Sequence, residues 1–322
     1  MRPYHITSSY LIARSIAFIL LISCSGTVIA QDSTGSAIPD SSRLATSPDT
    51  TAKTESAAGD IHSYFEAGIS YQSNNVYLGR KDSSALPYFI PTISYYHKSG
   101  FYATVSAAYL RTSPVQRVDV ITLESGFTFS AGNYAGDFTA SRYFYNSQST
   151  SVTSEIKGAL SYQNSYDFGF IRPVITSVVS FGNKPDFEAS FGLEHSFTFC
   201  HGNLEIIPTL QANASTLNYY SNYYKTRRFA RKGKKAVTGT VAVTGTVVDP
   251  SEFRILDYEP SLPVTFKAGN FKFSFTPTWA IPVNPAAIDL HYAWSTGTTA
   301  DKEKNEKIAN TFFWTLGVSY KF

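Results

Sequence analysis

The final segment of the chain, residues 311–322, constrains the fold more than any other part of the sequence. Every second residue in it is apolar or aromatic, namely Phe312, Trp314, Leu316, Val318, Tyr320 and Phe322. The residues between them, except Phe313, are small or polar. A period of two predicts a β-strand with two unlike faces. Because the apolar face continues to the last residue, we expect it to contact lipid as the closing strand of a membrane barrel.

The composition supports a strand-rich chain with one face in lipid. Charged residues make up 16% of the sequence, below the roughly 25% of soluble domains, whereas aromatic residues make up 15%. No segment after the N-terminal region is apolar enough for the roughly 20-residue span of a transmembrane helix. A membrane location therefore requires a closed barrel. The net charge of +3 is small and does not suggest a nucleic-acid partner.

Residues 1–30 have the layout of a cleaved signal peptide. Arg2 and Arg14 precede a short apolar run at 16–23, and Ala30 offers a small residue for cleavage. A second interpretation stays open, because Leu21-Ile22-Ser23-Cys24 resembles the site at which lipoproteins are acylated.

Residues 31–60 are rich in Ser, Thr, Asp, Ala and Pro, and such a stretch buries too little apolar surface to order itself. We expect a disordered periplasmic tail there, with insertion of this stretch into the lumen as the alternative, followed by a barrel over residues 61–322. That part reads as a succession of two-faced segments of about ten residues, the length of a tilted membrane strand. The fold class predicted is all-β, a closed antiparallel transmembrane β-barrel of about 12 strands. The predicted strands are 62–72, 86–97, 101–110, 118–129, 134–144, 151–162, 168–181, 187–200, 203–216, 254–266, 270–282 and 309–322.

The predicted connections alternate in length, which is a second signal. One set is short, and most of its members place Gly beside a strand end, as tight hairpins require. The other set is longer and includes 217–253 and 283–308. Short periplasmic turns that alternate with longer external loops are typical of outer-membrane barrels. The repeated Val-Thr-Gly-Thr-Val at 237–241 and 243–247 suggests a hairpin that extends above the membrane.

Several short stretches add a family resemblance. Tyr71–Arg80, Pro87-Tyr88 and Tyr95–Gly100 look like segments of uncharacterised outer-membrane β-barrel proteins of the Bacteroidetes, as does the signal ending at Ala30. The terminal segment resembles the aromatic signal that the bacterial barrel-assembly machinery recognises. The residues that carry this second resemblance are Trp314, Leu316, Val318, Tyr320 and Phe322. Together they imply an outer-membrane location, a porin-like fold and the assembly machinery as a partner.

The polar face of the strands should line a lumen in which acids exceed bases. Two interpretations remain open: a narrow channel that favours cationic solutes, or a salt-bridged filling that makes the barrel rigid. Twelve strands lie between the filled barrels of about eight strands and the open ones of 16 or more, so size does not decide. The candidate lumen residues are Glu66, Glu124, Asp137, Glu155, Lys157, Arg172, Glu188, Glu194, Glu205, Asp257, Glu259 and Lys272.

The longest predicted external loop carries a basic run. Such a run either contacts anionic lipopolysaccharide or is simply solvated. Its basic residues are Lys225, Arg227, Arg228, Arg231, Lys232, Lys234 and Lys235. The tyrosine-rich stretch 218–224 before it is predicted to be an interfacial aromatic girdle. The mixed-charge stretch 301–307 is predicted to be a solvated loop tip.

The sequence offers little for catalysis. His195 and Ser196 are adjacent on a strand and so point to opposite faces, which prevents them from pairing as base and nucleophile. We therefore expect no enzyme activity, no cofactor and no metal site. The predicted function is a porin-like narrow channel for small solutes in the outer membrane, with cationic solutes as one option. The alternatives are a non-conducting barrel for surface binding, adhesion or envelope integrity, and, third, a lipid-modifying enzyme.

Overall fold

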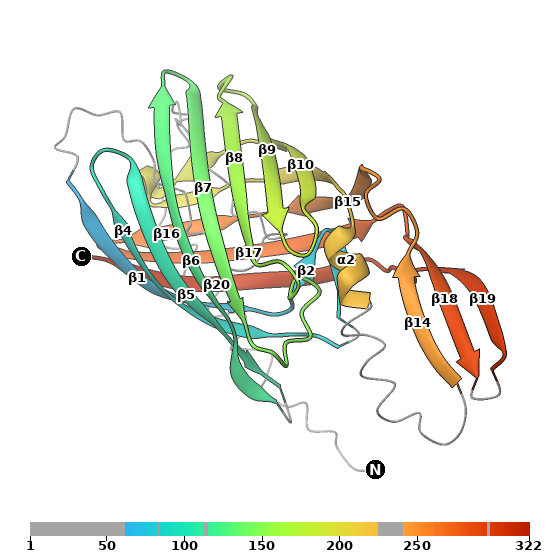
Figure 1. Ribbon diagram of the computed structural model, residues 1–322. Coiled ribbons are helices and arrows are strands. Elements are labelled where there is room, and N and C mark those ends of the chain that lie inside the picture. The colour runs from blue at the N-terminus through green and yellow to red at the C-terminus, as the bar shows by residue number, and fades with distance from the viewer. Residues whose placement is uncertain (1–61, 83, 113–114, 225–240, 295–296) are drawn as a thin grey trace, which may run out of the picture.

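The computed structural model describes residues 62–322, except 83, 113–114, 225–240 and 295–296. The predictions of a signal peptide at 1–30 and a disordered tail at 31–60 lie outside the described residues. The described part forms a closed antiparallel β-barrel of 12 strands, as predicted. The terminal strand closes the barrel, because it pairs with the first barrel strand on one side and with the preceding barrel strand on the other (Figure 1).

Nine barrel strands are continuous and three are built from two segments each. A break between two segments lies at Ile207 and Pro208, where proline removes a ladder donor. The strands in chain order are β1 (Tyr64–Gln72), β4 (Tyr88–Tyr96), β5 (Phe101–Arg111), β6 (Gln116–Ala131), β7 (Tyr134–Tyr145), β8 (Gly158–Tyr166), β9 (Arg172–Phe181), β10 (Asp186–Glu194) with β11 (Phe197–Phe199), β12 (Leu204–Ile206) with β13 (Thr209–Ser215), β15 (Arg254–Ser261) with β16 (Val264–Ala268), β17 (Phe271–Pro282) and β20 (Thr311–Lys321).

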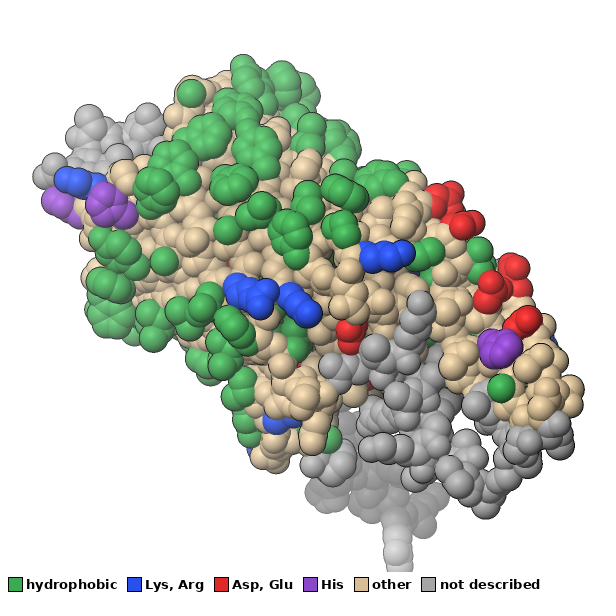
Figure 2. Space-filling view, viewed as in Figure 1, with side chains coloured by type: hydrophobic (Ala, Val, Ile, Leu, Met, Phe, Trp, Pro, Cys, Tyr) green, Lys and Arg blue, Asp and Glu red, His purple; other side chains and the backbone are tan. Residues whose placement is uncertain are grey.

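The two-residue period produces an apolar exterior and a polar interior. On β10, Phe187 and Phe191 are about half exposed, whereas Glu188 and Ser190 are buried. Apolar side chains spread in this way over the outer surface of the strands (Figure 2). In water such an exterior would be unfavourable, because apolar patches of that extent are rare on soluble monomers. In a bilayer it is the expected lipid-facing band.

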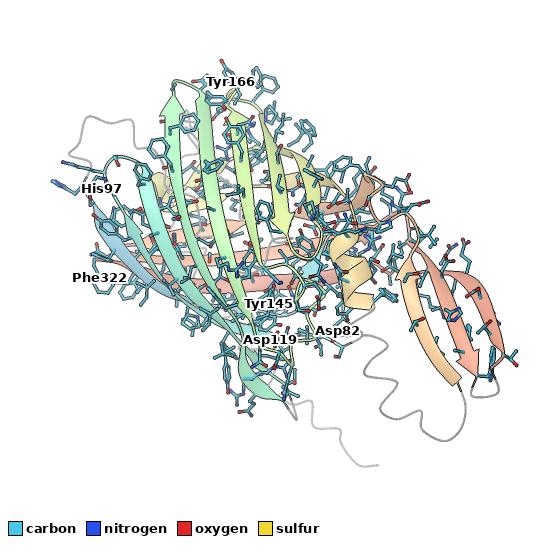
Figure 3. The ribbon with its side chains drawn as sticks, in the orientation of Figure 1. Asp82, His97, Asp119, Tyr145, Tyr166 and Phe322 are labelled. Carbon is cyan, nitrogen blue, oxygen red and sulfur yellow. The ribbon has the colours of Figure 1, made fainter. Side chains whose placement is uncertain are left out.

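The two ends of the barrel differ as the connection lengths predict. Short connections join the strands at the end that carries His97 and Phe322, and all the long connections lie at the end that carries Asp82 and Asp119 (Figure 3). Two connections at this second end, 112–115 and 182–185, are also short. One turn, at Gly100, requires glycine, because its φ is +96° and an added Cβ would lie 2.2 Å from the carbonyl oxygen of Thr128.

The long connections carry further elements. These are the two-stranded hairpin of β2 (Val76–Tyr77) and β3 (Arg80–Lys81), the helix α2 (Asn218–Tyr223), and a three-stranded sheet of β14 (Val241–Val247), β18 (Ala287–Trp294) and β19 (Thr299–Asn305). A short 3-10 turn, η1 (Cys200–Gly202), lies at the opposite end. None of the helices in the described ranges is long and apolar enough to cross a membrane.

Two predictions about these connections need correction. The hairpin expected at 237–248 pairs differently, because β14 pairs with β18 from the last connection; residues 237–240 lie outside the described ranges. The sixth strand, predicted at 151–162, begins only at Gly158. Val152 and Ile156 are 1% and 3% exposed and pack in an interior cluster, so their apolar spacing belongs to an internal core and not to a lipid face.

Candidate functional site

An apolar cluster closes the interior of the barrel at the end of the long connections. It joins residues from loops that are far apart in the sequence. We call it the plug, and its members are Tyr77, Leu78, Val152, Ile156, Leu217, Tyr219, Tyr220, Tyr223, Tyr224, Val247, Leu256, Ala286 and Ile288. The plug is packed like a small protein core, so the loop-side mouth is filled by side chains.

The tyrosines of α2 belong to this plug and not to an aromatic girdle. Tyr219, Tyr220, Tyr223 and Tyr224 are all 5% exposed or less, so the prediction of an interfacial position was wrong. The carboxylate of Asp186 accepts hydrogen bonds from the backbone N–H groups of Asn218 at 2.7 Å and Tyr219 at 2.8 Å. These bonds satisfy donors in the first turn of the helix. They attach α2 to the start of β10 and thereby direct its rings inward.

The hairpin of β2 and β3 is the second part of the plug. Its two turn residues, Leu78 and Gly79, have φ angles of 50° and 71°, as a two-residue type I′ turn requires. The turn lies against the barrel wall, because a Cβ added to Gly79 would lie 2.7 Å from Cβ of Pro282 and 3.0 Å from Cβ of Asp257. Only glycine allows both this backbone conformation and this close approach.

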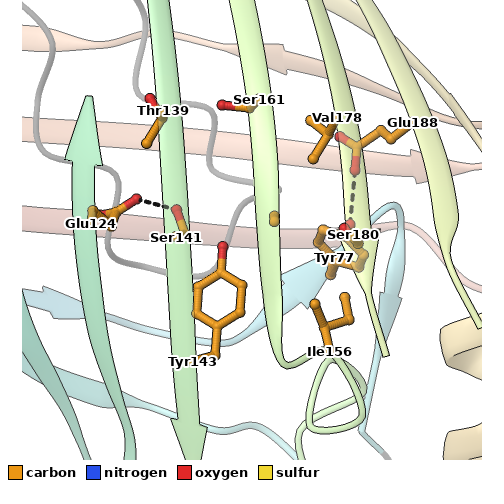
Figure 4. A pocket seen from close by; sticks show the side chains of 11 residues that line it. Tyr77, Glu124, Thr139, Ser141, Tyr143, Ile156, Ser161, Val178, Ser180 and Glu188 are labelled. Carbon is orange, nitrogen blue, oxygen red and sulfur yellow. Dashed lines mark hydrogen bonds between the residues drawn. The ribbon is translucent and has the colours of Figure 1, made fainter. Parts of the chain in front are cut away.

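Below the plug, the inner wall of the barrel forms a pocket. The pocket is small, with a volume of about 30 Å³, and it opens to solvent. Glu124 and Glu188 lie on opposite sides of it (Figure 4). Oε2 of Glu188 accepts a 2.8 Å hydrogen bond from the Tyr77 hydroxyl, and Oε1 of Glu124 accepts a 2.9 Å hydrogen bond from Ser141. The other lining residues are polar or aromatic (Thr139, Tyr143, Ser161 and Ser180) and apolar (Ile156, Ala159 and Val178).

Burial of the plug tyrosines affects their acidity. Burial, followed by the nearby charge of Glu188, raises the pKa of Tyr77 well above its usual value. Burial and the charge of Glu306 do the same to the pKa of Tyr220. Both phenols therefore stay protonated at neutral pH and act as hydrogen-bond donors to these carboxylates.

The predicted lumen residues divide by exposure. The buried ones are Glu124, Arg172, Glu188, Glu194, Asp257 and Glu259; the partly buried ones are Glu66, Asp137, Glu155, Glu205 and Lys272. Lys157 is exposed. Glu155 and Lys157 precede β8 because that strand starts later than predicted, so neither is a strand residue.

Two ion pairs among the predicted lumen residues lie near the short-turn half of the wall. Arg172 pairs with Glu194, its direct neighbour across β9 and β10, and Lys272 lies 3.1 Å from Glu66. Carboxylates elsewhere on the wall accept hydrogen bonds from hydroxyl groups, as Asp137 does from Thr139 at 2.6 Å. Among the predicted lumen residues as a set, acidic side chains outnumber basic ones.

The remaining candidate residues do not assemble a reactive site. Oγ of Ser196 donates to Glu205 at 2.6 Å, while the His195 ring packs edge-on against Phe197 at 4.5 Å. His291 pairs with Asp301 on the exposed sheet of β18 and β19. No group of three or more metal-ligating side chains occurs among the described residues. The basic residues Lys225, Arg227, Arg228, Arg231, Lys232, Lys234 and Lys235 lie outside the described ranges.

The exterior and the interior together decide the environment of the barrel. A closed sheet leaves no unpaired edge, its outer face is apolar, and its inner face is polar, which is the only strand architecture stable across a bilayer. The described part of the chain is a membrane-spanning β-barrel. Its terminal strand carries rings on the outer rim, where Tyr320 contacts Phe271 and Phe322 at centroid distances of 4.8 and 4.9 Å.

Solved structures similar to the barrel include porins and channels. A KdgM porin has a TM-score of 0.42 and 9% identity, with 80% of this chain and 99% of that chain covered. A NanC porin has the same score and identity, with 80% and 100% covered. An outer-membrane channel from Pseudomonas putida F1 has a TM-score of 0.41 and 8% identity, with 82% and 97% covered. No protein-family model and no curated protein sequence matches the chain.

Proposed function

We propose that the barrel is a narrow, porin-like channel for small cationic solutes. The observation that carries this proposal is the excess of carboxylates on the inner wall, with Glu124 and Glu188 facing one pocket. A polar lumen inside a low-dielectric wall focuses the field of its charged groups. Acidic linings favour the entry of cations, as rings of Asp and Glu do in cation channels.

The plug bears on how such a channel would operate. It contacts the inner wall at the end of the long connections, and we infer that conduction requires it to move. Leu256 lies on the barrel strand β15, but the β2–β3 hairpin, residues 146–157 and α2 belong to connections. They can shift while the strand pairings of the barrel remain intact.

A second candidate is a non-conducting barrel that serves surface binding, adhesion or envelope integrity. The close packing of the plug favours this candidate, because side chains such as Leu78, Leu217 and Leu256 are 0% exposed. A filled lumen also makes a barrel rigid. The third interpretation, a lipid-modifying enzyme, has no convergent set of side chains to support it among the described residues, and the proposal assigns no catalytic residue.

Conductance in planar lipid bilayers separates these candidates. The purified full-length protein should give discrete current steps, and the reversal potential in a salt gradient should indicate preference for K⁺ over Cl⁻. Liposomes that contain the protein should swell faster in isosmotic solutions of small cationic solutes than in those of small anionic solutes. Absence of any current above leak, with the protein shown to be inserted, would rule out the channel and leave the non-conducting barrel.

We extend the proposal to the envelope partners. The basic residues of 225–235 would contact lipopolysaccharide through its phosphates, and the terminal strand would be recognised by the barrel-assembly machinery. Replacement of the seven basic residues by Gln should weaken binding to lipopolysaccharide micelles, and unchanged binding contradicts the first assignment. The resemblance to Bacteroidetes barrels remains an expectation from short motifs.

A further inference from the structure

One arginine side chain, that of Arg80, is buried beside the plug. The side chain of Arg80, in the β2–β3 hairpin, is 1% exposed and that of Glu306, in the last connection, is 4% exposed. Nη2 of Arg80 lies 3.3 Å from Oε2 of Glu306. The guanidinium carbon lies 5.6 Å from the ring centre of Tyr220 in α2. Three connections that are distant in sequence therefore meet at a single cation.

The groups around Arg80 form a cage with the chemistry of guanidinium recognition. Besides the carboxylate and the ring, the backbone carbonyl oxygens of Leu78 and Asn284 accept hydrogen bonds at 3.0 and 3.4 Å. Carboxylates, carbonyls and aromatic faces are the usual partners of a planar guanidinium group.

The cage carboxylate is itself held in place. Glu306 accepts a hydrogen bond from the Tyr220 hydroxyl and one of 3.2 Å from the backbone N–H of Ala286. Most of the cage thus belongs to α2 and to the last connection, whereas its cation comes from the hairpin. If the hairpin moved away, the receptor part of the cage would remain.

We propose that Arg80 is a tethered guanidinium ligand that latches the plug, and that the vacated cage binds a guanidinium group on a small solute. Removal of one partner from a buried ion pair is strongly unfavourable, because the other charge stays buried and unpaired. The latch therefore opposes spontaneous opening. A solute guanidinium that replaces Arg80 supplies the missing charge and so stabilises the open arrangement. Passage of the solute through the barrel rests on the proposed channel function. The latch and the guanidinium site do not depend on it.

The test uses a reporter cysteine at Ala286, whose backbone N–H bonds to the cage carboxylate. Ala286 is 0% exposed, so an Ala286→Cys protein in detergent micelles should react slowly with a water-soluble maleimide. Adding Arg80→Ala should accelerate the reaction roughly tenfold or more, since a broken buried pair releases the hairpin. Ethylguanidinium chloride should slow it again, and an equal concentration of KCl should not. Parent protein without the reporter corrects for labelling at other positions.

Two variants serve as controls for this experiment. Lys81→Ala changes the exposed neighbour of Arg80 in the same hairpin and should leave the labelling rate unchanged. Glu306→Gln, added to Arg80→Ala, should abolish protection by ethylguanidinium. Equal rates for the Arg80 and Lys81 variants would refute the latch, and absence of protection would refute the binding site.

The outcome is independent of ion flow and remains decisive if one variant fails to fold. Should Arg80→Ala yield no heat-modifiable barrel on gels, Arg80→Lys replaces it, because Lys keeps the charge and loses the planar fork. That variant should label faster than Lys81→Ala, and an equal rate again refutes the latch. A protein that shows the latch but carries no current would contradict the channel alone.

Discussion

The Tyr77 hydroxyl donates a 2.8 Å hydrogen bond to Oε2 of Glu188, which joins the first long connection to the inner wall of the barrel. Both side chains are buried, at 6% and 5% exposure. The bond therefore lies in a medium where a lost partner is costly. It makes the same carboxylate both a wall group of the pocket and an anchor for the plug.

Replacement of Tyr77 by Phe should loosen the hairpin and leave the barrel intact. The change keeps the ring and deprives a buried carboxylate of a donor, which costs about 1–3 kcal/mol. Hydrogen exchange should accelerate at the amides of residues 76–81, while exchange within β10 stays slow. Tyr109→Phe, which removes an exposed hydroxyl bonded to Gln116 at 3.4 Å, is the matched control. Equal exchange in the two variants would show that the bond does not hold the hairpin.

The pocket carboxylates should set the charge preference of the channel. Glu124→Gln preserves the shape of a side chain that is 8% exposed and removes one negative charge from the lumen. The permeability ratio of K⁺ to Cl⁻ should fall by roughly two- to threefold, because a unit charge at short range is weakly screened there. Glu303→Gln, on the exposed strand β19, should leave the ratio unchanged. If both variants behave alike, the selectivity does not arise in the pocket.

The strands could be predicted from the sequence because lipid and lumen impose opposite demands on alternate residues. Phe187 and Glu188 illustrate this, since each could satisfy only one of the two faces. The same logic placed the terminal strand beside the first one, because a barrel in a bilayer has no edge. The positions of the tight turns could be predicted from glycines beside strand ends, such as Gly100.

The plug could not be predicted in the same way. Val152 and Ile156 have the spacing of a lipid-facing strand, and tyrosines at 219–224 have the composition of a girdle. Both become interior groups because the long connections fold back into the lumen, and tertiary contacts decide that. The pairing of Arg80 with Glu306 could not be predicted from the sequence. Arg80 lies in a predicted loop, and Glu306 lies in the stretch 301–307, which was expected to be solvated.

The terminal aromatic residues should govern assembly more than stability of the finished fold. The backbone N–H of Phe322 donates to the carbonyl of Phe65 at 2.9 Å, and its ring contacts Tyr320. Deletion of Phe322 together with Tyr320→Ser should reduce the amount of heat-modifiable barrel in outer-membrane fractions and leave synthesis unchanged. Phe170→Ala removes a ring that is 77% exposed in a short turn and should assemble normally. Normal assembly of the terminal variant would remove the proposed recognition signal.

A charge on the outer face should measure how deeply the strands lie in lipid. Phe191 is 48% exposed near the middle of the pairing between β9 and β10, where it is the direct neighbour of Ile175. Phe191→Arg should lower the free energy of unfolding from lipid vesicles by about 2–4 kcal/mol, the cost of Arg near the bilayer midplane of a barrel. Thr299→Arg, on the exposed β19 sheet outside the barrel, should change it by less than about 0.5 kcal/mol. Equal effects of the two substitutions would mean that Phe191 faces water. That result would contradict the assignment of the apolar exterior of the barrel to lipid.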